Sequence, residues 1–162
     1  MTHNNLDIKL RPTEIADLDI LFLFQTDKEG GYLAAFMSND PTDKSAYITK
    51  YTKLLADPTI NNQTILLDNT IVGSVAKFVM EGDPEVTYWI DRKYWGRGIA
   101  TNALTKFLMI EQTRPLYGRT AYDNYGSQKV LEKCGFKRIG KEKGFANARQ
   151  TEIEEIIYKL SD

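Results

Sequence analysis

The spacing of apolar residues changes several times along the chain, and each change predicts a new element. Apolar and charged residues alternate over 6–10, which is typical of a half-buried strand. Apolar residues then recur at helical spacing over 15–24, and a turn cluster at 38–41 leads into a second helical stretch over 43–55. Because Gly30 and Gly31 interrupt the first helical pattern, we expect that helix to end near Asp27.

Three runs rich in β-branched and aromatic residues occupy the middle of the chain, at 63–67, 71–80 and 85–90. The turn residues between them predict consecutive antiparallel strands. After Gly98 the apolar residues fall on one face of a helix, and a short strand follows at 117–122. A strand-helix-strand unit normally brings its two strands together in parallel, so we expect a mixed sheet.

The last part of the chain predicts a helix at 126–134, ended by Gly135, and two strands at 136–139 and 152–160. A polar connection around 144–150 joins these two strands. The expected order is β-α-α-β-β-β-α-β-α-β-β, an α/β (α+β) arrangement that excludes a fully parallel, doubly wound sheet. A length of 162 residues suits one domain of ordinary size, so we expect residues 1–162 to form a single domain.

Composition and charge narrow the class of protein. Hydrophobic residues make up 42% and charged residues 27% of the chain, which supports a packed core and argues against disorder. The formal charge is -1, so no overall field attracts nucleic acid or anionic lipid. The apolar run at 18–24 is far shorter than the roughly 20 residues that cross a bilayer, and the polar residues 1–7 lack the parts of a signal peptide. We expect a cytoplasmic protein, a monomer or a homodimer, without a nucleic-acid or membrane partner.

Cysteine and histidine are too scarce for several kinds of site. Cys134 is the single cysteine and His3 the single histidine, which excludes an internal disulfide, a cysteine-based zinc cluster and Ser-His or Cys-His catalytic pairs. We therefore expect no metal. Cys134 lies in an apolar stretch before Gly135, where a small buried side chain is a better interpretation than a nucleophile.

The segment 94–101, Tyr-Trp-Gly-Arg-Gly-Ile-Ala-Thr, carries the clearest chemical signal. Gly96 and Gly98 let the backbone approach a ligand, and the helix that follows presents unpaired N–H groups and the positive end of its dipole. Arg97 adds a charged donor suited to phosphate. A tight turn whose glycines serve packing alone is the simpler alternative. Thr101 replaces the third glycine of the dinucleotide fingerprint, and the chain lacks the Gly-Lys-Ser/Thr run of a nucleotide P-loop.

Two segments together resemble one known family. Residues 85–101, EVTYWIDRKYWGRGIAT, resemble the acetyl-CoA motif of the GNAT acetyltransferase superfamily, in particular its Rim-type branch, which includes ribosomal-protein N-acetyltransferases. Residues 124–136, NYGSQKVLEKCGF, resemble the second motif of that branch at the expected distance downstream. The resemblance extends more loosely over almost the whole chain. It implies a mixed, mostly antiparallel sheet flanked by helices and splayed between its fourth and fifth strands.

The resemblance also implies where acetyl-CoA binds. The pantetheine arm is expected in the opening between the splayed strands, and the pyrophosphate on the backbone N–H groups of residues 96–101. Side chains of the second motif are expected to face the cofactor near its thioester. The cofactor-binding residues expected on these grounds are Trp89, Ile90, Trp95, Gly96, Arg97, Gly98, Ile99, Ala100, Thr101, Asn124, Ser127, Lys129 and Val130.

Two positions depart from the family pattern. Thr87 stands where the residue before the strand-four Tyr-Trp pair is usually Gly, and this bears on the bulge that splays the strands. Leu131 occupies the place where many members have a tyrosine that protonates the departing thiolate. Tyr125 and Ser127 are substitutes within the same segment. Departure of the free thiolate is the alternative, because a thiol has a pKa near 8.5.

Transfer of an acetyl group to an amine requires a base. A lysine amine has a pKa of about 10.4 and an α-amine one of about 7.7 to 8.0, so a proton must be removed. Glu85, at the start of strand four, is the first candidate for that base, directly or through a water, with Asp83 and Glu81 behind it. An exposed turn carboxylate is the competing interpretation. The catalytic candidates are therefore Glu85, Tyr125 and Ser127.

The sequence thus predicts an acyltransferase, an N-acetyltransferase that passes an acetyl group from acetyl-CoA directly to a primary amine and releases coenzyme A. The acceptor is a small molecule or a protein N-terminus, selected by loops around 30–41 and 144–150 whose sequence does not distinguish the two. One alternative is a non-catalytic acyl-CoA-binding module, which the missing tyrosine suggests. Another is a nucleotide-binding domain, which the absent fingerprints disfavour.

Overall fold

The computed structural model describes residues 6–162, so His3 and most of the polar N-terminal stretch lie outside the described residues. The helices and strands are β1 (Ile8–Pro12), α1 (Leu18–Gln25), α2 (Lys28–Ala34), α3 (Lys44–Ala56), β2 (Asn61–Leu67), β3 (Thr70–Met80), β4 (Asp83–Ile90), α4 (Ile99–Ile110), β5 (Leu116–Ala121), α5 (Tyr125–Lys133), β6 (Lys137–Ala146) and β7 (Thr151–Leu160). Short 3₁₀ turns, η1 (Ile15–Asp17) and η2 (Arg92–Tyr94), precede α1 and follow β4. In residues 6–162, no helix combines the length and the apolar character needed to cross a membrane.

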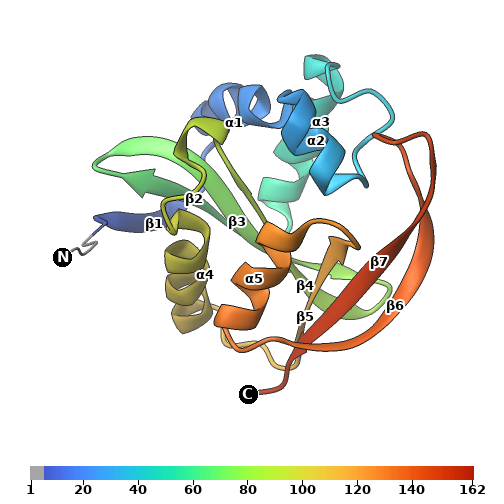
Figure 1. Ribbon diagram of the computed structural model, residues 1–162. Coiled ribbons are helices and arrows are strands. Elements are labelled where there is room, and N and C mark those ends of the chain that lie inside the picture. The colour runs from blue at the N-terminus through green and yellow to red at the C-terminus, as the bar shows by residue number, and fades with distance from the viewer. Residues whose placement is uncertain (1–5) are drawn as a thin grey trace.

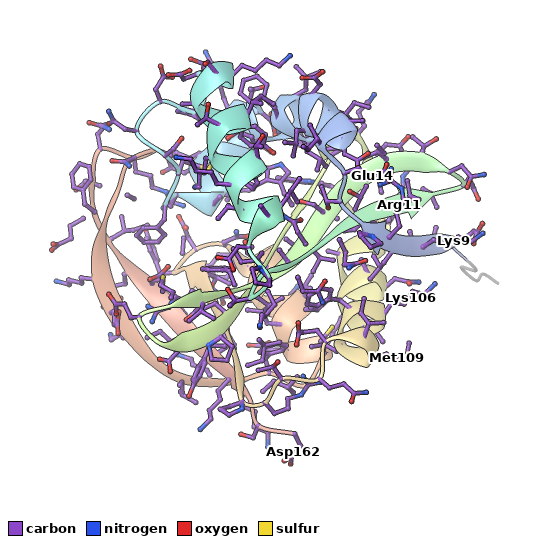
Figure 2. The ribbon with its side chains drawn as sticks, turned by 180° about the vertical axis from the view of Figure 1, so that it is seen from behind. Lys9, Arg11, Glu14, Lys106, Met109 and Asp162 are labelled. Atoms are coloured by element: carbon purple, nitrogen blue, oxygen red, sulfur yellow. The ribbon has the colours of Figure 1, made fainter. Side chains whose placement is uncertain are left out.

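Within the described residues the strands form one seven-stranded sheet in the order β1-β2-β3-β4-β5-β7-β6. Neighbouring strands are antiparallel except β4 and β5, which are parallel. Figure 1 shows α4 and α5 side by side in front of the sheet and α1, α2 and α3 gathered at its upper end. In the opposite view α3 comes to the front (Figure 2). The mixed, mostly antiparallel sheet flanked by helices is as predicted.

The main core lies between the sheet and α4. Leu104 and Phe107 of α4 are fully buried and belong to the same apolar cluster as Leu116 of β5. Full burial of one such side chain stabilises the fold by about 1.5–3 kcal/mol. Lys106, on the side of α4 near β1, donates a hydrogen bond from Nζ to the Ile8 carbonyl (Figure 2). Helix α4, and with it the loop that precedes it, is therefore held firmly against the sheet.

The prediction of two helices after the first strand is wrong, because a further helix, α2, follows α1. It begins after Asp27, whose side chain accepts a hydrogen bond from the Gly30 N–H at 3.0 Å, and it continues through both glycines. A Cβ atom on Gly30 would lie 3.1 Å from Trp89 Cζ2. The glycine therefore allows α2 to pack closely on β4 and does not mark a break.

The last hairpin is longer than predicted. Strand β6 continues to Ala146, so residues 144–146 of the connection expected around 144–150 are strand. β6 is an edge strand whose side chains are mostly exposed, and it lacks the apolar alternation on which the prediction depended. A Cβ atom on Gly144 would lie 3.2 Å from the Phe36 ring, so this glycine brings β6 against the segment that follows α2.

The parallel strands β4 and β5 pair over only two residues each, Glu85 with Tyr117 and Val86 with Gly118. Beyond these pairs β4 continues along β3 and β5 continues along β7, so the two strands diverge. This divergence is the predicted splay. The β3–β4 pairing runs without a register shift past Thr87, so the splay forms without a bulge at that residue.

Candidate active site

A cavity of about 880 Å³ occupies the opening between β4 and β5. Successive side chains of a strand point to opposite faces of the sheet, and both faces contribute to the lining. Tyr88 reaches Ser127 of α5 on one face, whereas the Trp89 indole reaches the Phe24 carbonyl of α1 on the other. The cavity therefore passes through the sheet, and two reactants can approach each other from opposite sides.

Glu85 lies at the narrow end of the opening, on the face that carries α1. The residue is only 3% exposed, and its Oε2 accepts a hydrogen bond from Arg119 Nε at 3.1 Å. Burial raises the pKa of Glu85 and outweighs the opposing effect of Arg119. A raised pKa makes this carboxylate a stronger base than a surface glutamate. The competing interpretation, an exposed turn carboxylate, is wrong for Glu85, although it describes its neighbours Asp83 and Glu81.

Arg119 connects three carboxylates that come from three different strands. Besides Glu85 of β4, its Nη1 donates to Glu142 of β6 at 3.0 Å and to Glu155 of β7 at 3.3 Å. Burial lowers the pKa of Arg119, but the hydrogen bonds to Glu142 and Glu85 outweigh that effect and raise it, so the guanidinium stays charged. Burial also raises the pKa of Glu155. Sequence reasoning missed Arg119, whose one available signal was a charged residue inside the short strand predicted at 117–122. Glu155 is one of three glutamates in the strand predicted at 152–160, which are expected on its solvent side or as an attraction for a cationic acceptor.

On the opposite face, the hydroxyls of Tyr88 and Ser127 lie 2.5 Å apart, within hydrogen-bonding distance. Burial raises the pKa of Tyr88, although the hydrogen bond with Ser127 opposes the shift. Leu131, one helical turn after Ser127, is buried, and a Cβ atom on Gly118 would lie 3.0 Å from it. Sequence analysis identified Ser127 but missed Tyr88, which approaches from the facing strand.

Two other residues of the second motif have different surroundings. Asn124 caps α5, accepting a hydrogen bond from the Ser127 N–H at 3.3 Å and donating one to the Leu33 carbonyl of α2 at 3.3 Å. It lines the cavity and ties α5 to α2. Tyr125 is 65% exposed and is not part of the lining, so the structure does not bring it together with Glu85 and Ser127.

The loop before α4 has the backbone that the glycines predict. Gly96 and Gly98 have φ angles of 80° and 76°, which side-chain-bearing residues rarely adopt, and both residues are exposed. Helix α4 starts at Ile99, and the Asn102 N–H donates to the Gly98 carbonyl at 3.1 Å. The N–H groups of residues 99–101 precede this first helical bond, so they are the ones that helix geometry leaves for a ligand. Arg97 stacks over the Tyr94 ring, 5.2 Å from its centroid.

The other residues predicted to bind the cofactor differ in location: one lines the cavity, several are packed within the fold, and others are exposed. Trp89 lines the cavity, whereas Ile90 and Trp95 do not. Trp95 Nε1 donates a hydrogen bond to the Ile90 carbonyl at 2.9 Å, which fixes the loop to the end of β4. Ile99 is buried in the core, Ala100 and Thr101 are half-buried on α4, Val130 is half-buried on α5, and Lys129 is exposed there.

Cys134 lies between α5 and α4, as expected of a small packed side chain. It is half-buried, and its Sγ is 3.6 Å from Thr105 Oγ1. Burial raises the pKa of its thiol, which disfavours the reactive thiolate. Among residues 6–162, no group of three or more His, Cys, Asp and Glu side chains is arranged to hold a metal ion.

Comparison with known proteins agrees with this geometry. The model of the acetyltransferase (GNAT) domain matches residues 7–137. No curated protein matches the chain. Similar solved structures include the self immunity acetyltransferase MccE in complex with acetyl-CoA and AMP, with 18% identity, a TM-score of 0.77 and coverage of 98% of this chain and 94% of that one.

Rim-type proteins are also among the similar structures. RimL, a ribosomal alpha-N-protein acetyltransferase crystallised with coenzyme A, has 16% identity and a TM-score of 0.78 over 98% of this chain and 95% of its own. The ribosomal-protein-alanine N-acetyltransferase from Brucella melitensis has 15% identity and a TM-score of 0.79 over 95% and 99%. At these identities the structures establish the shared fold, and the match of the family model over most of the chain establishes the family: the chain belongs to the GNAT acetyltransferases.

Proposed function

We propose that the protein transfers an acetyl group from acetyl-CoA to a primary amine, with both molecules bound at once in the cavity between β4 and β5. The observation that carries the proposal is the opening itself, which is lined from both faces of the sheet and has buried Glu85 at its narrow end. Acetyl-CoA supplies an activated acetyl group: the amine nitrogen adds to the acetyl carbon, and the bond from that carbon to sulfur then breaks.

The residues fit a coenzyme with a diphosphate and a long polar arm. The diphosphate would lie on the N–H groups of residues 99–101 and the exposed backbone of Gly96 and Gly98, where the helix dipole favours negative charge. The arm would follow the edge of β4 that faces the opening, beyond Val86, where that edge no longer pairs with β5. Strand-edge N–H and C=O groups are free there to bond the amides of the arm.

Glu85 is the base in this proposal. The acceptor amine approaches from the α1 face as an ammonium. Glu85 and Glu155 carry two negative charges, and Arg119 between them carries one positive charge, so the net negative charge attracts the ammonium. Glu85 then takes one proton from the ammonium, directly or through a water, and the nitrogen releases its second proton to solvent as the amide forms. Backbone N–H groups on the free edge of β4 stabilise the negative charge on the acetyl oxygen.

Leu131 stands where many members of the family have a tyrosine that protonates the thiolate. Tyr88 and Ser127 interact with the departing sulfur instead, but they do not protonate it. Burial raises the pKa of Tyr88, and a thiol has a pKa of about 8.5, so transfer of the tyrosine proton to the thiolate is unfavourable. One of the two hydroxyls donates its proton to the other, and the hydroxyl that accepts keeps its own proton free to hydrogen-bond the departing sulfur. Coenzyme A then takes its proton from solvent.

The test is a panel of amines incubated with acetyl-CoA while free thiol is followed. The panel should hold tripeptides with free N-termini, their N-acetylated counterparts as matched controls, and small amines. We expect thiol release with at least one free amine, together with a mass increase of one acetyl group on that amine. The opposite result, acetyl-CoA binding without thiol release across the panel, would favour the non-catalytic acyl-CoA-binding module.

The loop before α4 has a test of its own. Replacing Gly98 by Val forces a β-branched side chain into a φ of 76° at the start of α4. We expect acetyl-CoA affinity to fall at least tenfold in calorimetric titration. Gly82, in the exposed turn after β3 with a φ of 86°, is the matched control, and its Val variant should bind normally. Unchanged affinity of the Gly98 variant would contradict the diphosphate site.

A further inference from the structure

One hydroxyl in the cavity has no role in the reaction described so far. Thr120 of β5 is only 4% exposed, it lines the cavity, and its Oγ1 has no hydrogen-bond partner within the described residues. Buried polar atoms are nearly always hydrogen-bonded, because an unpaired one has lost its bonds to water without replacement. Valine has almost the same shape and a high preference for strands, so the fold alone gives no reason for a threonine here. The hydroxyl therefore points to a ligand.

The register of the sheet locates this hydroxyl beside Ser127. Thr120 follows Gly118 by two residues, so its side chain is on the same face of β5, and Gly118 lies against Leu131 of α5. Ser127 precedes Leu131 by one helical turn. Gln128 Nε2 donates to the Tyr122 carbonyl at 2.9 Å, so the first turns of α5 lie next to the end of β5. The hydroxyls of Thr120, Ser127 and Tyr88 thus line one side of the cavity.

The distance along β5 shows which part of the coenzyme would reach Thr120. The last β4–β5 pair is Val86 with Gly118, and Thr120 lies two residues further, about 7 Å along the strand. The proposed diphosphate site is at the other end of the opening, where β4 ends and α4 begins. A coenzyme that enters from α4 brings its sulfur end, and not its nucleotide, to the narrow end beside Thr120.

We propose that the Thr120 hydroxyl binds the sulfur end of acetyl-CoA, by a hydrogen bond to the thioester or to the amide next to it. This assignment rests on the proposed function. Thr120 gives β5 a polar contact opposite the edge of β4, so the reactive end of the coenzyme is held from both sides of the opening. Glu85, on the opposite face of the sheet, then meets an acetyl group whose position is fixed.

The test compares Thr120→Val and Thr120→Ser with the wild-type protein. Calorimetric titration measures affinity for acetyl-CoA and for adenosine 3′-phosphate 5′-diphosphate, the nucleotide half of the coenzyme, which lacks the arm. Thermal unfolding without ligand measures stability. We expect the Val variant to bind acetyl-CoA about five- to tenfold more weakly, to bind the nucleotide within about twofold of wild type, and to unfold at an equal or higher temperature. The Ser variant should keep acetyl-CoA affinity within about twofold.

Four results would overturn the assignment. Unchanged acetyl-CoA affinity of the Val variant means that the hydroxyl serves only a water. Equal loss of affinity for both ligands, or a lower unfolding temperature that Ser restores, means a structural role. Each of these results leaves the proposed function intact if the wild-type protein still releases thiol with an amine. A wild-type protein that fails to bind acetyl-CoA would overturn the assignment and the proposed function together.

Discussion

Two buried carboxylates, Asp17 and Glu85, are each 3% exposed and each bonded to an arginine, yet their surroundings differ. Asp17 accepts hydrogen bonds from Arg11 at 2.7 and 2.8 Å, from the Glu14 N–H at 2.8 Å and from the Thr64 hydroxyl at 2.9 Å. Figure 2 shows Arg11 and Glu14 close together where β1 leads towards α1. Glu85 accepts a hydrogen bond from Arg119, at 3.1 Å, and borders a cavity.

The difference in hydrogen bonding explains the opposite pKa shifts. The hydrogen bond from Arg11 lowers the pKa of Asp17 and outweighs burial, which acts the other way. For Glu85, burial is the larger effect and raises the pKa. A carboxylate that accepts four hydrogen bonds, as Asp17 does, is fixed in its ionised form and serves the fold. A carboxylate with unoccupied lone pairs beside a cavity can accept a proton, as catalysis requires.

The largest expected effect is on catalysis. Glu85→Gln should lower kcat at least 100-fold, because general-base catalysis contributes on the order of 10²–10⁴ in rate, while acetyl-CoA affinity and the unfolding temperature change little. Thiol release and thermal unfolding measure both. Glu142→Gln is the control, since Glu142 also bonds Arg119 but its side chain is largely exposed, and it should retain kcat within about threefold. A Glu85 variant as active as this control would remove Glu85 from the mechanism.

Asp17→Asn should have the opposite effect: a large loss of stability and little change in kcat. It leaves Arg11 opposite an amide and removes the charge from four hydrogen bonds, so the free energy of unfolding should fall by about 3 kcal/mol. Urea unfolding measures this loss. The folded variant should keep kcat within about twofold of wild type. If Glu85→Gln destabilised the protein more than Asp17→Asn, the assignment of the two carboxylates would be reversed.

The two arginines sharpen the comparison through pH dependence. Arg119 lowers the pKa of Glu85 against burial, so Arg119→Gln should raise that pKa further and move the acid limb of the kcat/KM profile to higher pH. Arg119→Lys should restore part of the shift. Arg11→Gln should decrease stability and leave the profile in place. Coincident profiles for wild type and Arg119→Gln would show that the acid limb belongs to another group.

The smallest effect is a difference in sign in the pH dependence of stability. The pKa of Asp17 is lowered in the folded state, so its contribution is present above its unfolded pKa and is lost as the pH falls through the folded value. The pKa of Glu85 is raised, so its contribution is present below its unfolded pKa and is lost as the pH rises through the folded value. In urea unfolding between pH 3 and 7, the free energy of unfolding of Asp17→Asn should fall furthest below that of wild type at pH 7. The free energy of unfolding of Glu85→Gln should be most favourable relative to wild type at pH 7. If the difference from wild type did not change with pH for either variant, both assignments would be contradicted.

The features that could be predicted from the sequence are local. The loop before α4 is recognised because a few consecutive residues contain both its glycines and its helix start, and both glycines have positive φ. Helix α2 was missed because Gly30 looks like a break, and the reason for the glycine is contact with Trp89, far along the chain. A close approach between distant segments leaves no periodic pattern in the sequence.

The same limit applies to the candidate site. Glu85 and Ser127 lie within the two motifs that resemble the family, so the sequence identifies them. The hydrogen bonds from Arg119 to Glu142 and Glu155 exist only because β5 pairs with β7 and β7 pairs with β6. Thr120 looks like any threonine in a strand until the cavity beside it is known.

The most direct test of the account is a crystal structure of the protein with coenzyme A. We expect the arm to lie between residues 87–90 of β4 and 119–121 of β5, the diphosphate on the backbone of residues 96–101, and the sulfur near Tyr88, Ser127 and Thr120. A coenzyme bound on another surface, or β4 and β5 paired along their whole length with no space between them, would contradict it.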